Sequence, residues 1–334
     1  MEKIKINLTA KTVQDLNNDI ISFEFYKKNG EANRNGFLNT LLKNYFSIYD
    51  EQVSEEIDRY EKVIKNHVFN EAKATDLINE LLSSSKYFSF QKSDTLDSPI
   101  SIKLSNSNYN IYRIIESKYL NYQSVSSFFR NMIESYLELP KYKREQIIYL
   151  DTFELISEAI KDSRKIRLFT KSGADRLVMP CIISTNKEEL FNYLLCFTES
   201  KNDCLVVNSF HLSKIDSVFL LKEKFNLKEE EISKINNVVK NGAQFPYTNA
   251  CNAKIQLTKE GQRLYKKKYL NRPNTVEIND DIYSFCCSFD QLVLYFFSFG
   301  KDANVIYPDY LKNTLKNKYL EAYNSYSSEE FDKI

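Results

Sequence analysis

Two short stretches, "KIKINL" at residues 3–8 and "ISIKLS" at residues 100–105, decide the predicted fold of this chain. In each stretch apolar and polar residues alternate with the period of two that is typical of a β-strand with one buried face. The residues of the two apolar faces are Ile4, Ile6, Leu8, Ile100, Ile102 and Leu104. A single strand cannot satisfy its own backbone hydrogen bonds, so we expect the two strands to pair antiparallel as a ribbon.

The polar residues of the two stretches form the outward face of this predicted ribbon. These candidate nucleic-acid-binding residues are Lys3, Lys5, Asn7, Ser101, Lys103 and Ser105. Phosphate contacts dominate the affinity of proteins for nucleic acids, and three lysines make the face only weakly basic. Two hypotheses therefore remain open: a nucleic-acid-binding ribbon, or a solvated ribbon that serves folding or dimerisation. The sequence also leaves open whether the strands pair within one chain or between two chains.

Each strand is followed by two helical patterns that repeat along the chain. Thr9 is predicted to cap a helix that extends to about Lys27. A second helix begins near Phe37, and its adjacent apolar pairs recur every four residues. The closing helix of the second copy, which Pro140 ends, repeats these pairs with Phe128 at the position of Phe37.

The order of strand, helix and helix in residues 3–48 and 99–139 resembles the ribbon-helix-helix family. The resemblance implies that the outward strand residues enter a major groove. It also implies that the start of each second helix grips a phosphate, and polar residues stand near both starts: Asn33, Asn35, Ser124 and Ser126. Between the two copies, residues 51–98 combine helical periodicity with acidic charge, and we predict a helical spacer there.

The composition excludes several classes of function. The 46 basic and 45 acidic residues leave a net charge of +1, so any surface for a polyanion must be local. Residues 99–150 hold 7 basic and 4 acidic residues, a local excess of +3. The chain has two histidines, six glycines and neither a GxxxxGK nor a GxGxxG motif. We therefore predict a binding protein that is not an enzyme, with no catalytic residue, no metal site and no cofactor.

The cysteines and the apolar runs indicate the compartment. Six cysteines form no CxxC pair and no signal peptide precedes them, which favours reduced thiols in the cytoplasm. The most apolar run, residues 282–299, contains Asp290 and Gln291 and is too short to span a bilayer comfortably. We predict that this run belongs to a protein core and that the chain has no membrane partner.

From residue 151 onward a helical pattern gives way to short apolar strands separated by turn residues, which is typical of a small barrel. The segment has an "SG" turn, Arg176 four residues before Pro180, "YL" at Tyr193 and "FHLSKI" at residues 210–215. This order resembles the WYL domain. The resemblance implies a compact Sm-like or SH3-like barrel of the kind found in bacterial regulators of nucleic acids.

The WYL resemblance also implies a pocket for nucleic acid or a nucleotide-like ligand. The candidate pocket residues are Arg167, Lys171, Arg176, Tyr193, His211 and Lys214. The sequence departs from the family pattern, because Asn192 replaces the tryptophan, and Asn208, His211 and Lys214 occupy arginine positions. These changes reduce the positive charge with which the predicted pocket could bind an anion. Tyr193 is interpreted equally well as barrel core, and His211 as a neutral surface side chain.

Residues 225–334 resemble the C-terminal extension that often follows WYL domains. They contain a basic segment with two tyrosines, which suits a single-stranded backbone with stacked bases. Its residues are Arg263, Tyr265, Lys266, Lys267, Lys268, Tyr269 and Arg272. A solvated turn is the alternative interpretation of this segment.

The sequence therefore predicts an α+β multidomain protein with five parts. These are a first ribbon-helix-helix copy (1–50), a helical spacer (51–98), a second copy (99–150), a WYL barrel (151–224) and a small α+β C-terminal extension (225–334). The two copies together form a tandem ribbon-helix-helix region that is mostly helical.

This order of parts resembles the accessory WYL proteins of type VI-D CRISPR systems. The resemblance implies a homodimer in antiviral defense that binds single-stranded RNA and enhances an RNA-guided CRISPR ribonuclease. The alternative is a transcription regulator whose ribbon binds duplex operator DNA and whose WYL pocket senses a nucleotide-like ligand. A third possibility is an assembly scaffold that binds neither nucleic acid.

Overall fold

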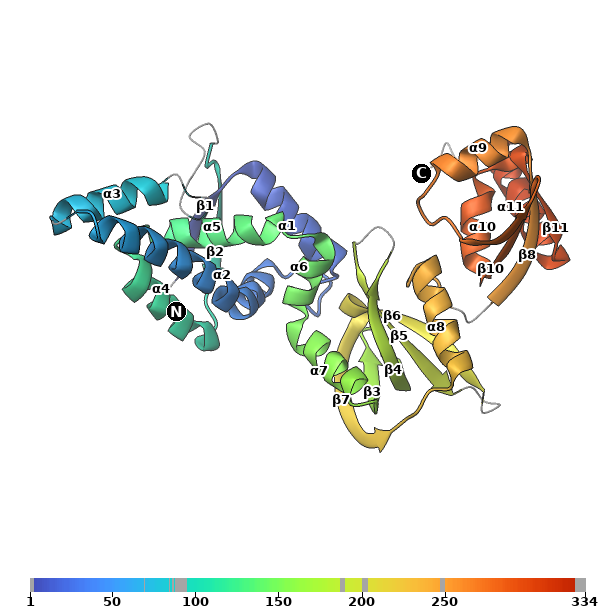
Figure 1. The fold of residues 1–334 in the computed structure, drawn as a ribbon, viewed down its shortest axis with the longest axis horizontal. Helices are drawn as coiled ribbons and strands as arrows, with labels where there is room; N and C mark the ends of the chain where they lie inside the picture. The colour runs from blue at the N-terminus through green and yellow to red at the C-terminus, as the bar shows by residue number, and fades with distance from the viewer. Residues whose placement is uncertain are drawn as a thin grey trace. The chain divides into compact units, whose positions relative to one another are not determined.

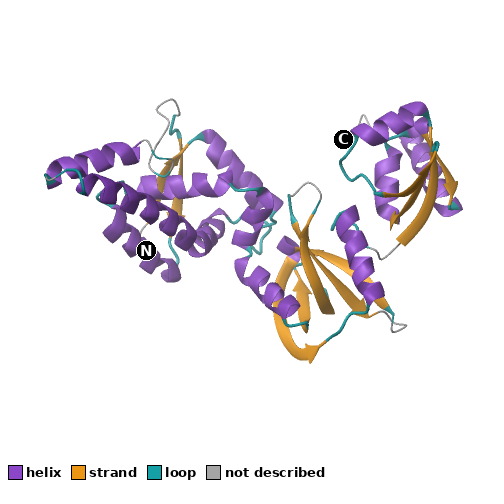
Figure 2. Cartoon of the chain, in the orientation of Figure 1, coloured by secondary structure: helices purple, strands orange, loops and turns teal. Residues whose placement is uncertain are grey.

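The computed structural model describes residues 3–327 except 69, 84, 86, 88–94, 187–189, 200–203 and 247–249. The chain divides into two compact units, Met1–Leu150 and Asp151–Ile334 (Figure 1). The first unit is mostly helical, whereas the second contains most of the strands (Figure 2). The predicted α+β class is confirmed.

The first unit is built around a two-stranded ribbon. β1 (Lys3–Leu8) and β2 (Ser98–Lys103) pair antiparallel, with Ile4 opposite Ile102 and Ile6 opposite Ile100. The predicted pairing is therefore confirmed, and it occurs within a single chain. The second strand begins and ends two residues earlier than predicted, because the backbone after Lys103 turns toward a helix instead of continuing the ladder.

The helices of the first unit surround this ribbon. They are α1 (Ala10–Ser22), α2 (Arg34–Lys65), α3 (Glu71–Ser83), α4 (Tyr109–Tyr119), α5 (Val125–Glu138) and α6 (Lys141–Ile148), with a short 3-10 turn η1 (Asn106–Asn108) before α4. Their shared core is rich in aromatic rings. The Phe128 ring lies 4.8 Å from that of Tyr119 and 5.2 Å from that of Tyr49, so the predicted apolar pairs do face the core.

One predicted helix end is wrong. α1 ends at Ser22 rather than near Lys27, because Glu24 adopts a left-handed φ of 50°. α2 is one continuous helix, and the division at residue 50 that we predicted between the first copy and the helical spacer falls inside it. The buried stripe of α2 continues through Tyr49 and Val53, which are both fully buried. The helix therefore continues past residue 50.

The second unit begins with α7 (Leu150–Lys161) and a five-stranded antiparallel sheet. Its strands lie in the order β6-β5-β4-β3-β7. Their bounds are β3 (Arg164–Thr170), β4 (Asp175–Thr185), β5 (Asn192–Glu199), β6 (Leu205–His211) and β7 (Ile215–Lys224), with a 3-10 turn η2 (Leu212–Lys214) before β7. The predicted strands are confirmed. Within the described residues no ladder joins β6 to β7, so closure into a barrel stays a prediction.

A helix within the predicted C-terminal extension covers one face of this sheet. α8 (Glu229–Asn241) places Ile235 and Val238 in one apolar cluster with Leu195 and Phe197 of β5. The predicted boundary at residue 225 therefore separates α8 from the sheet on which it packs. The physical reason is that β5 and its neighbours expose an apolar face that the strands alone cannot bury.

The rest of the second unit is a four-stranded sheet with its own helices. The sheet has the order β11-β8-β10-β9. The elements are β8 (Ala250–Leu257), α9 (Lys259–Lys267), β9 (Thr275–Asn279), β10 (Ile282–Ser288), α10 (Phe289–Phe297), a 3-10 turn η4 (Gly300–Asp302), β11 (Ala303–Tyr307) and α11 (Asp309–Ser327). The apolar run at residues 282–299 forms β10 and α10, and Phe285 and Phe296 lie in the core as predicted. No helix among the described residues is long and apolar enough to cross a bilayer.

Candidate nucleic-acid interface

The ribbon exposes the polar face that the alternation predicts. Lys3, Lys5 and Asn7 of β1 are exposed, as are Ser101 and Lys103 of β2. Lys3 lies directly opposite Lys103, and Lys5 opposite Ser101. Because directly opposed residues of two paired strands project from the same face, these five side chains share one surface.

Ser105 does not belong to this face. It follows the end of β2, and its hydroxyl lies 2.9 Å from the Ser107 hydroxyl in η1. Its backbone N–H donates to the Asn39 side-chain oxygen on α2 at 2.8 Å. The prediction that Ser105 lies on the ribbon face is therefore wrong, because this bond pulls the chain away from the ladder.

The charge on the ribbon face is concentrated at one end. Lys3 and Lys103 are like charges placed directly opposite each other, an arrangement that costs roughly 0.2–1 kcal/mol. In the described part of the chain, neither they nor Lys5 form an ion pair with a carboxylate. The other end of the ribbon pairs Asn7 with Pro99 and carries no charge. We define Lys3, Lys5 and Lys103 as the lysine face.

Two asparagines of α2 hold the outer edge of β2. The Asn35 side chain accepts from the Lys103 N–H at 2.8 Å and donates to the Lys103 carbonyl at 3.2 Å. The Asn39 side chain donates to the same carbonyl at 3.0 Å. These bonds fix the backbone beneath the lysine face, and the sequence pattern gave no sign of them.

Three of the four polar side chains near the predicted phosphate-gripping helix starts have other partners, and the fourth, Ser126, has a buried hydroxyl. The Asn33 side chain accepts from the Gly36 N–H at 3.0 Å and caps α2. The Ser124 hydroxyl accepts from the Ser127 N–H at 3.1 Å and caps α5. Asn35, as described, holds β2. Capping is the ordinary role of asparagine and serine at these positions, and it uses the amides that a phosphate would otherwise meet.

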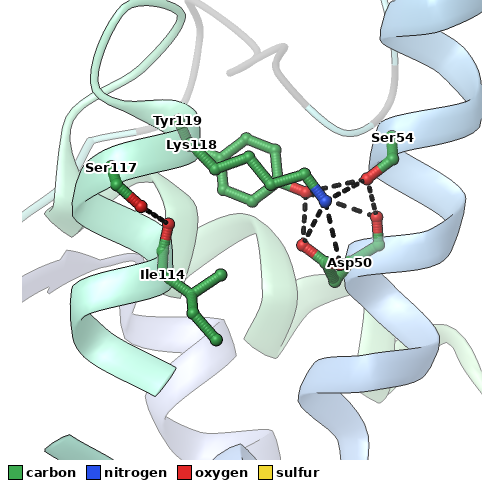
Figure 3. A network of polar contacts seen from close by, with 6 residues as sticks. All are labelled: Asp50, Ser54, Ile114, Ser117, Lys118 and Tyr119. Carbon is green, nitrogen blue, oxygen red and sulfur yellow. Dashed lines mark hydrogen bonds and ion pairs between the residues drawn. The ribbon is translucent and has the colours of Figure 1, made fainter. Parts of the chain in front are cut away.

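A polar network joins α4 to α2 and engages Lys118, one of the cations of the basic segment 99–150 (Figure 3). The Lys118 ammonium lies 3.0 Å from both oxygens of Asp50 and 2.6 Å from the Ser54 hydroxyl. The Tyr119 hydroxyl donates to Asp50 at 2.5 Å. Burial, together with this bond to Asp50, raises the pKa of Tyr119 well above its ordinary value. Lys118 therefore stabilises the packing of α4 on α2, and we do not count it among the cations that could bind a nucleic acid.

The predicted WYL pocket residues do not converge on one site. Arg167 lies opposite Leu177, whereas Arg176 lies opposite Leu168. Since neighbouring residues of a strand point to opposite faces, Arg167 and Arg176 project from opposite faces of the sheet. The prediction of a single pocket that contains both arginines is wrong, because the strand register separates them.

Arg167 is also engaged by an acid. Its guanidinium forms a bidentate pair with Asp175, with nitrogen to oxygen distances of 2.6 and 3.0 Å. This pair lowers the pKa of Asp175 and raises that of Arg167. Arg176 is exposed, and its guanidinium donates to the Asp175 carbonyl at 3.0 Å.

The other predicted pocket residues form two local groups. Tyr193 lies opposite His211, and their rings stack with centroids 5.0 Å apart. Tyr193 also packs against the apolar cluster under α8, which supports its interpretation as core. Lys171 and Lys214 are both exposed, and the Lys171 N–H donates to the Lys214 carbonyl at 3.0 Å.

The basic segment of the C-terminal module offers one exposed aromatic ring rather than two. Tyr265 packs against the core of the four-stranded sheet, and its hydroxyl donates to the Pro273 carbonyl at 2.7 Å. The ring is partly buried and packs on the rings of Tyr283 and Phe285, so less of it is available for the predicted stacking role. Tyr269 is 75% exposed.

The cations of this segment are engaged to different extents. Arg263 pairs with Glu260 on α9, and the Lys268 ammonium lies 2.9 Å from the Ser298 hydroxyl. The Arg272 guanidinium carbon lies 5.5 Å from the centre of the Tyr265 ring. Lys266 and Lys267 are exposed.

Comparisons with known proteins establish the fold. No protein-family model matches the chain, and no curated protein matches it. Among solved structures, it is similar to one described as the crystal structure of a CRISPR Cas-related protein, with a TM-score of 0.73 and 18% identity over 98% of this chain and 94% of that chain. The chain shares the fold of that CRISPR Cas-related protein. Proteasome accessory factor B/C of Arthrobacter aurescens aligns with a TM-score of 0.28 and 16% identity over 70% of this chain and 38% of that one.

Proposed function

We propose that the protein is a non-enzymatic accessory of a CRISPR system that binds single-stranded RNA and enhances an RNA-guided CRISPR ribonuclease. The observation that carries the proposal is the lysine face, three exposed cations on a ribbon that α2 holds in place, with no carboxylate paired to them among the described residues. The similarity to a CRISPR Cas-related protein over nearly the whole chain supports the biological setting.

The distribution of charge favours a single strand over an operator. Ribbon-helix-helix dimers with identical subunits present the same residues at both ends of the ribbon, which suits palindromic half-sites. Here one end carries Lys3 and Lys103, whereas the other ends in Asn7 and Pro99. A ligand without two-fold symmetry suits such a face better than a palindrome does.

Operator binding remains the second candidate because of the shape of the ribbon. A two-stranded antiparallel ribbon with an exposed polar face fits into a major groove. In this alternative the protein is a transcription regulator, and the WYL-like sheet senses a nucleotide-like ligand.

The first experiment compares unstructured single-stranded RNA with duplex DNA of the same length. We expect tighter binding to RNA, and the combined Lys3→Ala, Lys5→Ala and Lys103→Ala variant should bind RNA about tenfold more weakly or worse, because each lysine contributes a charged contact. Lys11→Ala is the matched control, since Lys11 is exposed and follows the uncharged end of the ribbon. Fluorescence anisotropy at fixed salt measures the affinity of each variant for the RNA and for the duplex DNA. Preference for one duplex sequence would support the regulator instead.

A second experiment tests the accessory role separately from binding. RNA cleavage by an RNA-guided CRISPR ribonuclease from the same genome is measured with and without the wild-type chain. We expect faster cleavage with the wild type and no gain with the triple lysine variant. Tight RNA binding without any effect on cleavage would refute the accessory role and leave the RNA-binding role standing.

A further inference from the structure

We propose that Tyr109 and Arg113 in the first turns of α4 form a stacking site for an unpaired RNA base and continue the lysine face. This inference rests on the proposed RNA binding and names a part of the surface that would carry it. It concerns side chains outside both strands, in a helix that the family resemblance does not assign to nucleic-acid contact.

The geometry of α4 keeps this pair at the surface. The helix buries Tyr112, Ile115 and Tyr119. Tyr109 is 40% exposed, and Arg113 is exposed one turn later. The Arg113 guanidinium carbon lies 5.2 Å from the centre of the Tyr109 ring. The Tyr112 ring, at 6.0 Å and tilted by 31°, supports the Tyr109 ring from the buried side of the helix.

No carboxylate of the described residues pairs with Arg113. Two other cations of the same basic segment do form ion pairs, because Lys118 pairs with Asp50 and Arg144 pairs with Asp19, each at 3.0 Å. A guanidinium held over a tyrosine ring offers a flat surface for a base and donors for a phosphate. Single-strand binding proteins combine these two features.

The pair follows directly after the charged end of the ribbon. From Lys103 the chain takes three residues to Asn106 and then the 3-10 turn η1 to Tyr109. An extended step spans about 3.4 Å and a 3-10 step about 2 Å, so the two backbones are at most about 16 Å apart. Lys3 lies opposite Lys103 at the same end. The lysine face and the pair Tyr109 and Arg113 are therefore within reach of one strand of RNA.

The chemistry of this site selects an unpaired base. Bases within a duplex are already stacked on their neighbours, so an aromatic ring on a protein surface has no free base face to meet. Bases of a single strand are available, and stacking tolerates any sequence because every base has a π-face. The site therefore commits the ligand to single-stranded nucleic acid, consistent with the asymmetric charge of the ribbon.

The test is a titration of the full-length chain with unstructured single-stranded RNA and with duplex DNA. Tyr109→Ala and Arg113→Ala should each weaken RNA binding about fivefold or more, whereas Tyr109→Phe keeps the ring and should bind like the wild type. Duplex affinity should change less than twofold in all three. Tyr326→Ala on α11, which removes a tyrosine that is 93% exposed, is the control for loss of a surface ring.

The outcomes separate this inference from the proposed function. If the wild type binds no RNA, the proposed function fails and the inference fails with it. If the wild type and the triple lysine variant behave as expected but Tyr109→Ala and Arg113→Ala bind RNA normally, only the stacking site is refuted. An equal loss in Tyr109→Phe, or a lowered melting temperature in Tyr109→Ala, would show that the pair only stabilises α4.

Discussion

At the scale of single residues, Asp19 of the first unit is a buried carboxyl whose pKa differs from its ordinary value. Its side chain lies in the core with one oxygen 3.0 Å from the Arg144 guanidinium. Burial raises its pKa to about 6 although Arg144, the Tyr136 hydroxyl and Lys141 all lower it, and Asp15 adds a small increase. Desolvation therefore outweighs the ion pair, as is common for buried charges.

This pKa predicts how stability depends on pH. Because the folded-state value of about 6 lies above the ordinary value of 3.8, the folded chain binds the proton more tightly. The stabilisation from protonated Asp19 is complete below about pH 4 and is lost as pH rises to about 6, a change of about 3 kcal/mol in the free energy of unfolding.

The measurement is urea unfolding at pH 4.5, 5.5 and 7. Asp19→Asn should remove this part of the pH dependence, whereas Asp76→Asn, on the exposed side of α3, should keep the wild-type profile. Parallel profiles for the wild type and Asp19→Asn would show that Asp19 does not titrate in this range.

At the scale of elements, Asn39 shares with Asn35 the attachment of β2 to α2, and it alone of the two also binds the turn after β2. Asn39 donates to the Lys103 carbonyl at 3.0 Å and accepts from the Ser105 N–H at 2.8 Å and from the Asn108 side chain at 3.1 Å. The side chain thus binds the end of β2 and the following turn to the same point of the helix.

Removing this side chain should loosen the ribbon. Asn39→Ala leaves the Ser105 N–H without its acceptor, so we expect a loss of about 1–3 kcal/mol in the free energy of unfolding. Faster amide hydrogen exchange at residues 98–105 would locate the effect. Asn18→Ala, at an exposed position of α1, should change stability by less than about 0.5 kcal/mol. Equal stability of both variants would mean that these bonds contribute nothing net.

At the scale of the whole molecule, the nearly balanced charge limits how RNA binding depends on salt. A net charge of +1 provides no general attraction for a polyanion, so affinity must come from local cations, and we propose those of the lysine face and Arg113. Each phosphate neutralised on a single strand contributes about 0.7 to the slope of log K against log salt.

Four such contacts predict a slope of about −3 for single-stranded RNA between 50 and 300 mM salt. The triple lysine variant should reduce the slope to about −1, because it removes three of the four contacts. Titrations at five salt concentrations measure both slopes. A wild-type slope steeper than about −6 would require a further basic surface, and Lys266 and Lys267 would be the first residues to test.

The sequence by itself determined which segments become strands and helices and which strands find each other. The alternation in residues 3–8 and the apolar pairs around Phe37 and Phe128 are local patterns, and burial of one face follows from them directly. The short apolar strands after residue 151 are predicted for the same reason, whereas their arrangement in a five-stranded sheet comes from the structure.

Only the tertiary structure decided which of the polar residues remain available to a ligand. Strand register separates Arg167 from Arg176, Asp50 engages Lys118, and the sheet core takes up part of the Tyr265 ring. These outcomes depend on neighbours from distant parts of the chain, which a local pattern does not specify. Conversely, Arg113 and Tyr109 stand out only because the fold stacks Arg113 on the Tyr109 ring, pairs it with no carboxylate of the described residues, and places both residues just beyond the charged end of the ribbon.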